Sequence, residues 1–360
     1  MRALLTLLLV LVATACGNAY ESRSGDVFDA HVTRVVSTTE QTTPDGLRQL
    51  TQRVEIELDG SLYRGDRVEV GWGGRVPITR NGLLRPGDQV LVSQRRAEDG
   101  TREYAIEDVV RLPSLLPVAA AALIALLAVG RLKGLASIAG LAVSVAAFLL
   151  AVLPAIQRGD DPLLATLIGS ALILAATVYL VHGLNRKSTA ALAGTTVGLV
   201  VVAGLGWLGI ALSRITGLGD EESVFLAVGT GFSIDMTKLV LAGIIVASLG
   251  ALADMAVGQA STTFELAAVD RSLRGRALYS SALNVGRDHV GSLVNTLALA
   301  YFGGALPLVL LLSLGNSPLV VALNGETIAI SLLGVLAATC GLVIAVPVTT
   351  AAAVALVRSR

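Results

Sequence analysis

Long apolar runs fill the last two-thirds of this 360-residue chain. They fall near residues 114–131, 134–156, 161–182, 189–213, 238–264, 288–313 and 329–357, and each carries few charged side chains. A helix needs about 20 mostly apolar residues to cross the ~30 Å hydrocarbon layer of a membrane. In a chain of this composition only helices can satisfy their backbone groups inside lipid. The runs therefore predict a polytopic α-helical membrane domain of about seven transmembrane helices over residues 113–360.

The N-terminal third has a different character. Charged residues make up 15% of the whole chain, well below the ~25% of soluble proteins, and residues 20–112 hold most of them. Short runs there follow the period of two that is typical of strands, and turns rich in Gly, Asp and Pro separate them. The runs are 27–36, 53–58, 67–70, 89–92 and 104–110. Five short strands predict a small β-barrel-like domain, and an OB-like barrel is one form that fits.

Residues 1–19 read as an export signal. Arg2 precedes an apolar run over residues 3–15, which is too short to span a membrane and resembles the core of a signal peptide. The residues Ala13-Thr14-Ala15 offer a cleavage site, and with Cys16 they form a loose lipobox that would make Cys16 a lipidation site. An uncleaved signal anchor is the third alternative. All three predict that residues 20–112 are extracytoplasmic.

The distribution of basic residues predicts the orientation of the helices. Alternate connections carry the cations, and the intervening ones are mainly acidic. The basic connections contain Arg131 and Lys133, Arg186 and Lys187, Arg271, Arg274 and Arg276, and finally Arg358 and Arg360. Because basic loops stay in the cytoplasm, seven spans place the C-terminus inside and the β domain outside. The export signal predicts the same orientation independently.

Several classes of function are disfavoured. The formal net charge is zero and no segment is strongly basic, so we expect no nucleic-acid partner. Cys16 and Cys340 lie far apart without metal-ligand spacing, and we predict neither a metal site nor a cofactor. The string Gly217-Leu218-Gly219-Asp220 matches a motif of intramembrane aspartyl proteases, but no second aspartate occurs in a matching helix context. Since the common hydrolase and nucleotide-binding motifs are also missing from the sequence, we do not expect an enzyme.

Two predicted helices carry polar stripes. At 100° per residue, one face of the fifth helix holds only small or polar side chains, with Asp254 well inside the apolar run. This face consists of Gly243, Ala247, Gly250, Asp254, Gly258, Ser261 and Glu265. The stripe of the sixth segment consists of Asn284, Asp288, Gly291, Asn295 and Ala298, with Arg287 beside it. We expect the two stripes to face each other or to line a wet cavity.

An aspartate inside a membrane costs about 2.5–3.5 kcal/mol on insertion scales, so it is expected to be paired, protonated or hydrated. One interpretation is an ion or transport path formed by Asp254, Ser261, Glu265, Asn284, Arg287, Asp288 and Asn295. The other is a structural network, for example between Asp254 and Arg287. The glycines Gly243, Gly250, Gly258 and Gly291 are predicted to allow close helix packing. Asp235 and Lys238 either anchor the start of the fifth helix or form the outer mouth of the path.

The strings that carry these stripes resemble a known family. The segment from Asp235-Met236-Thr237-Lys238 to Ala253-Asp254-Met255, the string Asn284-Val285-Gly286-Arg287-Asp288 and the string Ala300-Tyr301-Phe302-Gly303-Gly304 are similar to the YibE/F-like family of bacterial membrane proteins. The resemblance covers about residues 110–357. It implies a multi-pass protein of the bacterial plasma membrane and implies little about a substrate.

Two functional hypotheses follow. The first is a secondary transporter or ion-coupled permease of unknown substrate, an ion or a small solute, with Asp254 as the titrating group. The second is a non-transporting envelope scaffold or sensor. In that case the β domain binds a partner, and the stripes hold helices or subunits together in the bilayer, in a homo-oligomer or with a membrane partner. A water-accessible cavity between the fifth and sixth helices would indicate transport, whereas a dry, hydrogen-bonded contact would indicate scaffolding.

Overall fold

The structure, a computed structural model, describes residues 27–42, 48–59, 64–73, 78–96, 101–315 and 318–358. The export signal and Cys16 lie outside the described residues. The chain divides into two compact units, residues 1–129 and residues 130–360, and we treat each by itself. The first unit contains the predicted β domain and the first apolar helical segment, and the second contains the remaining helices.

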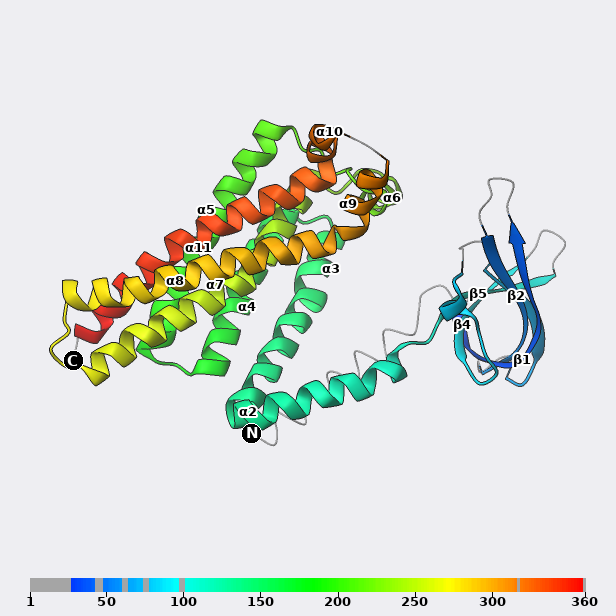
Figure 1. Cartoon of the computed structure of the whole chain (residues 1–360), viewed down its shortest axis with the longest axis horizontal. Coiled ribbons are helices and arrows are strands. Elements are labelled where there is room, and N and C mark those ends of the chain that lie inside the picture. Colours follow the sequence, from blue (N-terminus) through cyan, green and yellow to red (C-terminus); the bar gives the residue numbers. More distant parts are fainter. Residues whose placement is uncertain are drawn as a thin grey trace. The chain divides into compact units, whose positions relative to one another are not determined.

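The first unit contains one antiparallel sheet of five strands (Figure 1). The strands are β1 (Val27–Thr42), β2 (Arg48–Leu58), β3 (Arg67–Trp72), β4 (Gln89–Arg96) and β5 (Arg102–Val109). Their order in the sheet is β3-β2-β1-β4-β5, so the long β1 pairs with β2 and with β4. Two register shifts, between Val32 and Arg34 and between Val35 and Ser37, interrupt the β1–β2 ladder. Such bulges bend a strand, which lets the sheet curl into an open, OB-like half-barrel.

Alternating side chains build the core of this half-barrel. On β2, Val54, Ile56 and Leu58 are completely buried, whereas Glu55 and Glu57 between them point away from the core. Burying the apolar side chains of one face while the other stays polar is what fixes the register of such a strand. The prediction of five strands is therefore confirmed, with β1 and β2 extending further than the apolar pattern indicated.

The helical elements follow β5. They are α2 (Leu112–Ala147), η2 (Phe148–Val152), α3 (Leu153–Gln157), α4 (Pro162–His182), α5 (Arg186–Ser213), α6 (Glu221–Gly229), α7 (Met236–Val269), α8 (Arg276–Gly304), α9 (Leu306–Leu314), α10 (Leu319–Asn324) and α11 (Glu326–Arg358). Arg131 has non-helical backbone angles inside α2, which separates an apolar helix ending at Arg131 from the next one beginning at Lys133. The predicted joint between the first two spans is confirmed at this position.

Among the described residues, six helices are long and apolar enough to cross a membrane, and a seventh span results if α8 and α9 are counted together. These two helices are bent by 62° against each other. The break falls at Ala305, and Pro307 lies in the first turn of α9, where a residue without an N–H donor is tolerated. The sixth span predicted near residues 288–313 falls within this bent pair. The helix begins twelve residues earlier, at Arg276, and is broken before it ends.

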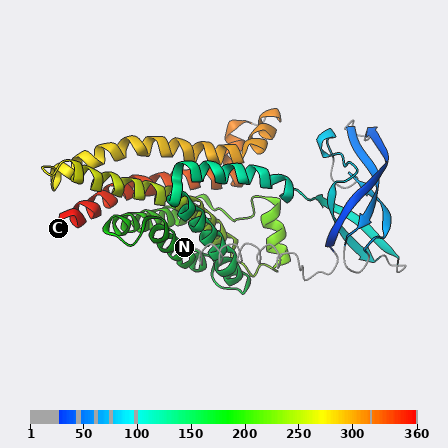
Figure 2. The same ribbon diagram turned by 90° about the horizontal axis from the view of Figure 1, so that it is seen from below.

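The helices α5, α7 and α11 form the centre of the second unit, and Figures 1 and 2 show the long helices lying along one another. The helix α4 packs on α7, and α8 packs on both α7 and α11. The shared core contains Val202, Leu241, Ile245, Leu252 and Leu342, all of which are almost fully buried. Their burial leaves the opposite side of α7 outside this core.

Contacts along the chain define two ends of the helical unit. At one end, which we call the Glu326 end after the first residue of α11, Lys238 near the start of α7 meets Asp161, the N-cap residue of α4. At the other end, which we call the hairpin end because α7 is joined to α8 there, Lys187 of α5 and Glu265 of α7 form an ion pair of 3.5 Å. The predicted loop charges thus gather at opposite ends of the same helices.

Candidate functional site

The stripe on α7 points out of the bundle. Gly243, Ala247, Gly250 and Asp254 are exposed, whereas the opposite face of the helix is buried against α5, α11 and α4. The carboxylate of Asp254 makes no hydrogen bond or ion pair with any residue of the described chain. His182, the last residue of α4, lies near enough to act on this carboxylate electrostatically when its ring is protonated.

Asp254 lies in the second half of the bundle, counted from the Glu326 end. It lies sixteen residues after Lys238, or about 24 Å along the helix axis at 1.5 Å per residue. The 21 residues of α4 cover about 32 Å between Asp161 and His182 on the same scale. Asp254 therefore lies nearer to the hairpin end than to the Glu326 end, and it remains inside the long apolar helix α7.

The stripe on α8 also points outward. Asn284, Arg287, Asp288, Gly291 and Asn295 are all exposed, while Ala282 and Gly286 on the other side of the helix are buried. Arg287 donates a hydrogen bond to Asn284 of its own helix, at 3.1 Å, and the predicted pairing of Arg287 with Asp254 does not form. Each stripe is thus exposed in this chain, and within the described residues no hydrogen bond or ion pair joins one stripe to the other.

Gln259, which belongs to neither stripe, forms a buried contact between α7 and α8. The side chain of Gln259 is 3% exposed, and its Nε2 donates to the carbonyl oxygen of Ala282 at 2.9 Å and to Oγ1 of Thr350 at 2.7 Å. Thr350 in turn donates to the carbonyl oxygen of Val346 at 2.8 Å. One amide thus joins α7, α8 and α11 in a buried, hydrogen-bonded contact.

The glycines that pack helices together are not the predicted ones. A Cβ added at Gly243, Gly250, Gly258 or Gly291 would meet nothing within 4 Å, so these residues bring no other helix of this chain close. Close approach occurs instead at glycines of α2, α4, α5, α8 and α11. They are Gly140, Gly169, Gly194, Gly198, Gly206, Gly209, Gly286, Gly334 and Gly341. The physical reason is that the predicted glycines share the outward face of their helices.

Ser261 and Glu265, the last two members of the α7 stripe, lie near the hairpin end. Ser261 is half-buried, and Glu265 is exposed and forms the ion pair with Lys187 already described. Arg186, next to Lys187, donates a hydrogen bond of 3.3 Å to the backbone of Leu356 in α11. In this structure Glu265 therefore connects α7 to the start of α5 rather than to the α8 stripe.

The proposed outer mouth forms a charged cluster at the Glu326 end. Asp235 is the N-cap of α7 and accepts hydrogen bonds from the backbone of Lys238, at 3.1 Å, and from the hydroxyl of Thr237, at 2.6 Å. Lys238 forms ion pairs with Asp161, at 2.5 Å, and with Asp235, at 3.8 Å. The cluster ties the start of α4 to the start of α7, which matches the anchoring interpretation of Asp235 and Lys238.

These contacts predict an acid-dependent loss of stability. The hydrogen bond from Lys238 holds the pKa of Asp161 below its ordinary value. A carboxyl group whose pKa is lower in the folded state stabilises the fold above its ordinary pKa, and this contribution disappears as the pH falls through the lowered value. We expect thermal unfolding curves between about pH 6 and pH 3 to show a smaller acid-induced decrease of Tm in Asp161→Asn than in the wild type. Asp160→Asn, in the neighbouring exposed ion pair with Arg158, is the control.

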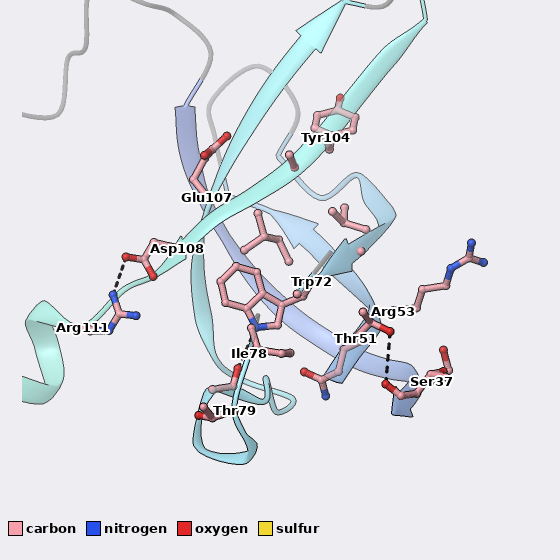
Figure 3. A pocket seen from close by; sticks show the side chains of 18 residues that line it. Ser37, Thr51, Arg53, Trp72, Ile78, Thr79, Tyr104, Glu107, Asp108 and Arg111 are labelled. Carbon is pink, nitrogen blue, oxygen red and sulfur yellow. Dashed lines mark hydrogen bonds and ion pairs between the residues drawn. The ribbon is translucent and has the colours of Figure 1, made fainter. Parts of the chain in front are cut away.

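The first unit contains a pocket that the sequence did not reveal. Its volume is about 910 Å³, and it lies at the open seam of the half-barrel, where β3 and β5 approach without pairing in any ladder between the described strands (Figure 3). Trp72 lies in the middle of the lining and donates its indole N–H to the carbonyl oxygen of Gly82 at 2.9 Å. The hydroxyls of Ser37, Thr39 and Thr51 add polar groups from β1 and β2.

Charged groups surround the indole. Glu107 on β5 accepts a hydrogen bond from Ser93 at 2.5 Å, and Asp108 pairs with Arg111 at 2.6 Å. The guanidinium of Arg111 holds the pKa of Asp108 below its usual range, so that carboxyl stays ionised. Arg53 lies on the opposite side of the pocket, on β2, and pairs with Glu69 at 3.5 Å. The pocket therefore offers an aromatic ring, hydroxyls and both signs of charge to a ligand.

Comparison with known proteins bears on the second unit. The sequence matches the family described as YibE/F-like protein over residues 118–359, which is the region where the resemblance was noted. Neither the curated proteins nor the solved structures gave a match. The match begins near the start of the first apolar helix and covers all later helices, and the apolar helices fit a multi-pass membrane protein. The chain belongs to the YibE/F-like family.

Proposed function

We propose that this protein is a multi-pass receptor or scaffold of the bacterial plasma membrane. Its half-barrel, here called the β unit, lies outside the cytoplasm and binds a ligand in the pocket between β3 and β5, here called the seam pocket. The pocket around Trp72 is the observation that carries the proposal. Ligand sites are typically concave and combine apolar or aromatic lining with a few polar groups that set orientation. The lining described above fits a small polar ligand with an apolar or aromatic part.

The helical unit supports this proposal through its buried contact between α7 and α8. The contact between α7 and α8 is closed by Gln259, and the carboxylates and amides of the two stripes face outward. Lipid chains cannot hydrogen-bond to such groups, whereas another protein segment or water can. In the proposed function these faces bind further membrane subunits, and the helices carry the β unit at the membrane surface. The basic connections and the export signal favour the orientation with the β unit outside.

Tryptophan fluorescence tests the proposed binding. The chain contains two tryptophans, Trp72 and Trp207, so Trp207→Phe leaves the indole in the pocket as the reporter. We would titrate this variant in lipid nanodiscs with a panel of amino acids, short peptides and sugars. A saturable change in the emission of Trp72 is expected with at least one class of ligand.

The variant Gly71→Leu provides the matched test. Gly71 lines the pocket on β3, and a Cβ there meets nothing within 4 Å, so a leucine adds bulk at the edge of the pocket without a clash among the described residues. We expect it to abolish the saturable change, whereas Arg85→Leu in an exposed turn leaves it unaffected. If no ligand class gives a response, or if Gly71→Leu titrates like its parent, the binding function is wrong.

Ion-coupled transport is the second candidate, and Asp254 is the observation that favours it. Its carboxylate is exposed on α7, has no hydrogen-bond or ion-pair partner within the described residues, and interacts electrostatically with His182. A path at this position would follow the outer face of α7 and would need a second subunit to close it. Transport predicts that Asp254→Asn abolishes ion flux in proteoliposomes while Asp160→Asn does not. Equal flux in both variants would argue against it.

A further inference from the structure

A groove at the Glu326 end opens between two neighbouring helices. It has a volume of about 630 Å³ and lies between α4 and α5, with α7 beneath. Its lining is mainly apolar and includes Leu163 of α4, Trp207, Ile210 and Ala211 of α5, and Leu241 of α7. All of these residues belong to helices that are long and apolar enough to cross a membrane. In a bilayer the groove therefore faces lipid.

Two cations lie at the polar end of this groove. Arg214 follows the last residue of α5 and adopts a left-handed backbone conformation with φ of 53°, which turns the chain at that point. Its side chain is exposed and makes no hydrogen bond or ion pair with the described part of the chain. Lys238 reaches the groove from α7, and its charge is already balanced by Asp161 and Asp235. Arg214 thus contributes the uncompensated positive charge of this site.

Trp207 indicates the depth of the groove relative to the membrane. It is 63% exposed, although it is one of the largest apolar side chains in the chain. Tryptophan is enriched where hydrocarbon meets headgroups, because its ring is apolar and its N–H can bond to polar groups. It precedes Arg214 by seven residues on α5, which is about two turns of helix. An apolar groove, an interfacial tryptophan and a free cation therefore follow one another along the outward side of α5.

We propose that this groove binds an anionic phospholipid, with its phosphodiester at Arg214 beside Lys238 and an acyl chain along Trp207, Ile210 and Leu241. Basic pockets between transmembrane helices are suited to anionic headgroups, and arginine binds phosphate oxygens through paired donors. A zwitterionic headgroup carries its own ammonium or choline, which the unpaired guanidinium of Arg214 disfavours. The apolar lining disfavours a free inorganic anion. This site lies in the helical unit and does not depend on ligand binding by the β unit.

Contact quenching of Trp207 tests the proposal in the full-length protein. The variant Trp72→Phe leaves Trp207 as the reporter, and phospholipids with brominated acyl chains quench an indole that they touch. We would compare brominated phosphatidylglycerol with brominated phosphatidylcholine of the same chains in mixed micelles. Bulk lipid contact affects both equally, so the ratio of half-quenching mole fractions is the measurement. We expect phosphatidylglycerol to quench at about tenfold lower mole fraction, the ratio that a single charge-assisted contact supports.

Substitutions and a competing anion separate the outcomes. We expect Arg214→Gln to remove the preference, Arg214→Lys to retain part of it, and Arg158→Gln in the exposed loop before α4 to leave it unchanged. Ala211→Phe fills the groove without changing a charge and should also weaken specific quenching. Unchanged thermal unfolding confirms that each variant is folded. The proposal is overturned if wild-type quenching is equal for both lipids, if Arg214→Gln retains the preference, or if inorganic phosphate at matched concentration displaces phosphatidylglycerol.

Discussion

Gly194→Ala is expected to destabilise the helical unit by about 2 kcal/mol, although alanine is the better helix former by about 1 kcal/mol. A Cβ on Gly194 of α5 would lie 1.7 Å from Oγ1 and 2.8 Å from Cβ of Thr349 on α11. Thr349 is completely buried, and its hydroxyl has no hydrogen-bond partner within the described residues. Neither helix can move away easily, because α5 and α11 both also pack on α7.

Thermal unfolding of the purified protein in detergent measures this effect, and Gly250→Ala is the matched control. A Cβ on Gly250 of α7 meets nothing within 4 Å, so this substitution is expected to be neutral or to raise stability by up to about 1 kcal/mol. Adding Thr349→Ala to Gly194→Ala removes the clashing oxygen and should recover part of the loss. Equal stability of the two single variants would contradict the packing of α5 on α11 described above.

Glu326→Ala is expected to cost about 3 kcal/mol and to loosen the loop that joins α5 to α6. The carboxylate of Glu326 accepts hydrogen bonds from the backbone N–H groups of Thr216, at 2.9 Å, and of Gly217, at 2.6 Å, and from the hydroxyl of Thr216. Hydrogen bonds to a charged group are worth about 1.5–3 kcal/mol each. Because this site is partly exposed to solvent, we expect their sum to stay near about 3 kcal/mol. Gly217 has φ of 80° and packs against the backbone of Met236, so loosening it also affects the start of α7.

Glu326→Gln separates hydrogen bonding from charge at this position. The amide oxygen can still accept from both backbone N–H groups, so we expect a loss of only about 1 kcal/mol. Hydrogen exchange at the amides of Thr216 and Gly217 gives a local readout, which should accelerate strongly in Glu326→Ala and weakly in Glu326→Gln. Unchanged protection of both amides in Glu326→Ala would show that the carboxylate does not hold this loop.

The sequence predicted those elements whose patterning is local. Alternation over Val54, Ile56 and Leu58 identified β2, and the length of apolar runs identified the spans that the structure retains. The second half of β1 was missed because residues 37–42 are mostly polar, yet the backbone ladder to β2 continues through them. The break before α9 was missed because Pro307 lies inside an otherwise continuous apolar run, and hydropathy alone does not register a missing N–H donor.

Periodicity identified which residues of α7 share a face but could not identify what that face contacts. The helix α7 packs on α5, α11 and α4, so its broad apolar face around Ile245 and Leu252 turns inward and the small, polar face turns out. Gln259 was the available signal for the buried contact, since an uncharged polar residue on the apolar side of a transmembrane helix needs a partner. Its partners, Ala282 and Thr350, lie 23 and 91 residues away, which no local pattern reveals.

The seam pocket illustrates the same limit more strongly. Ser37, Trp72 and Tyr104 come from β1, β3 and β5, and only the order of strands in the sheet brings them together. Taken one by one, a hydroxyl or an aromatic ring on a strand is most often part of an ordinary surface or core. The function proposed here therefore depends on the fold, whereas the membrane character of the chain could be predicted from composition alone.

The most direct test of this account is thiol labelling along α7 in intact membranes, after Cys16 and Cys340 are replaced by alanine. A small, water-soluble reagent is applied to single cysteines at positions 254 and 259, with Thr263→Cys as a second buried position. The account predicts no labelling of Gln259→Cys or Thr263→Cys in the folded protein and slow labelling of Asp254→Cys, which another membrane segment covers, whereas Ser233→Cys in the exposed segment before α7 is labelled rapidly. Labelling of position 259 as fast as position 233 would reveal water between α7 and α8, and would contradict the buried contact on which the receptor or scaffold function depends.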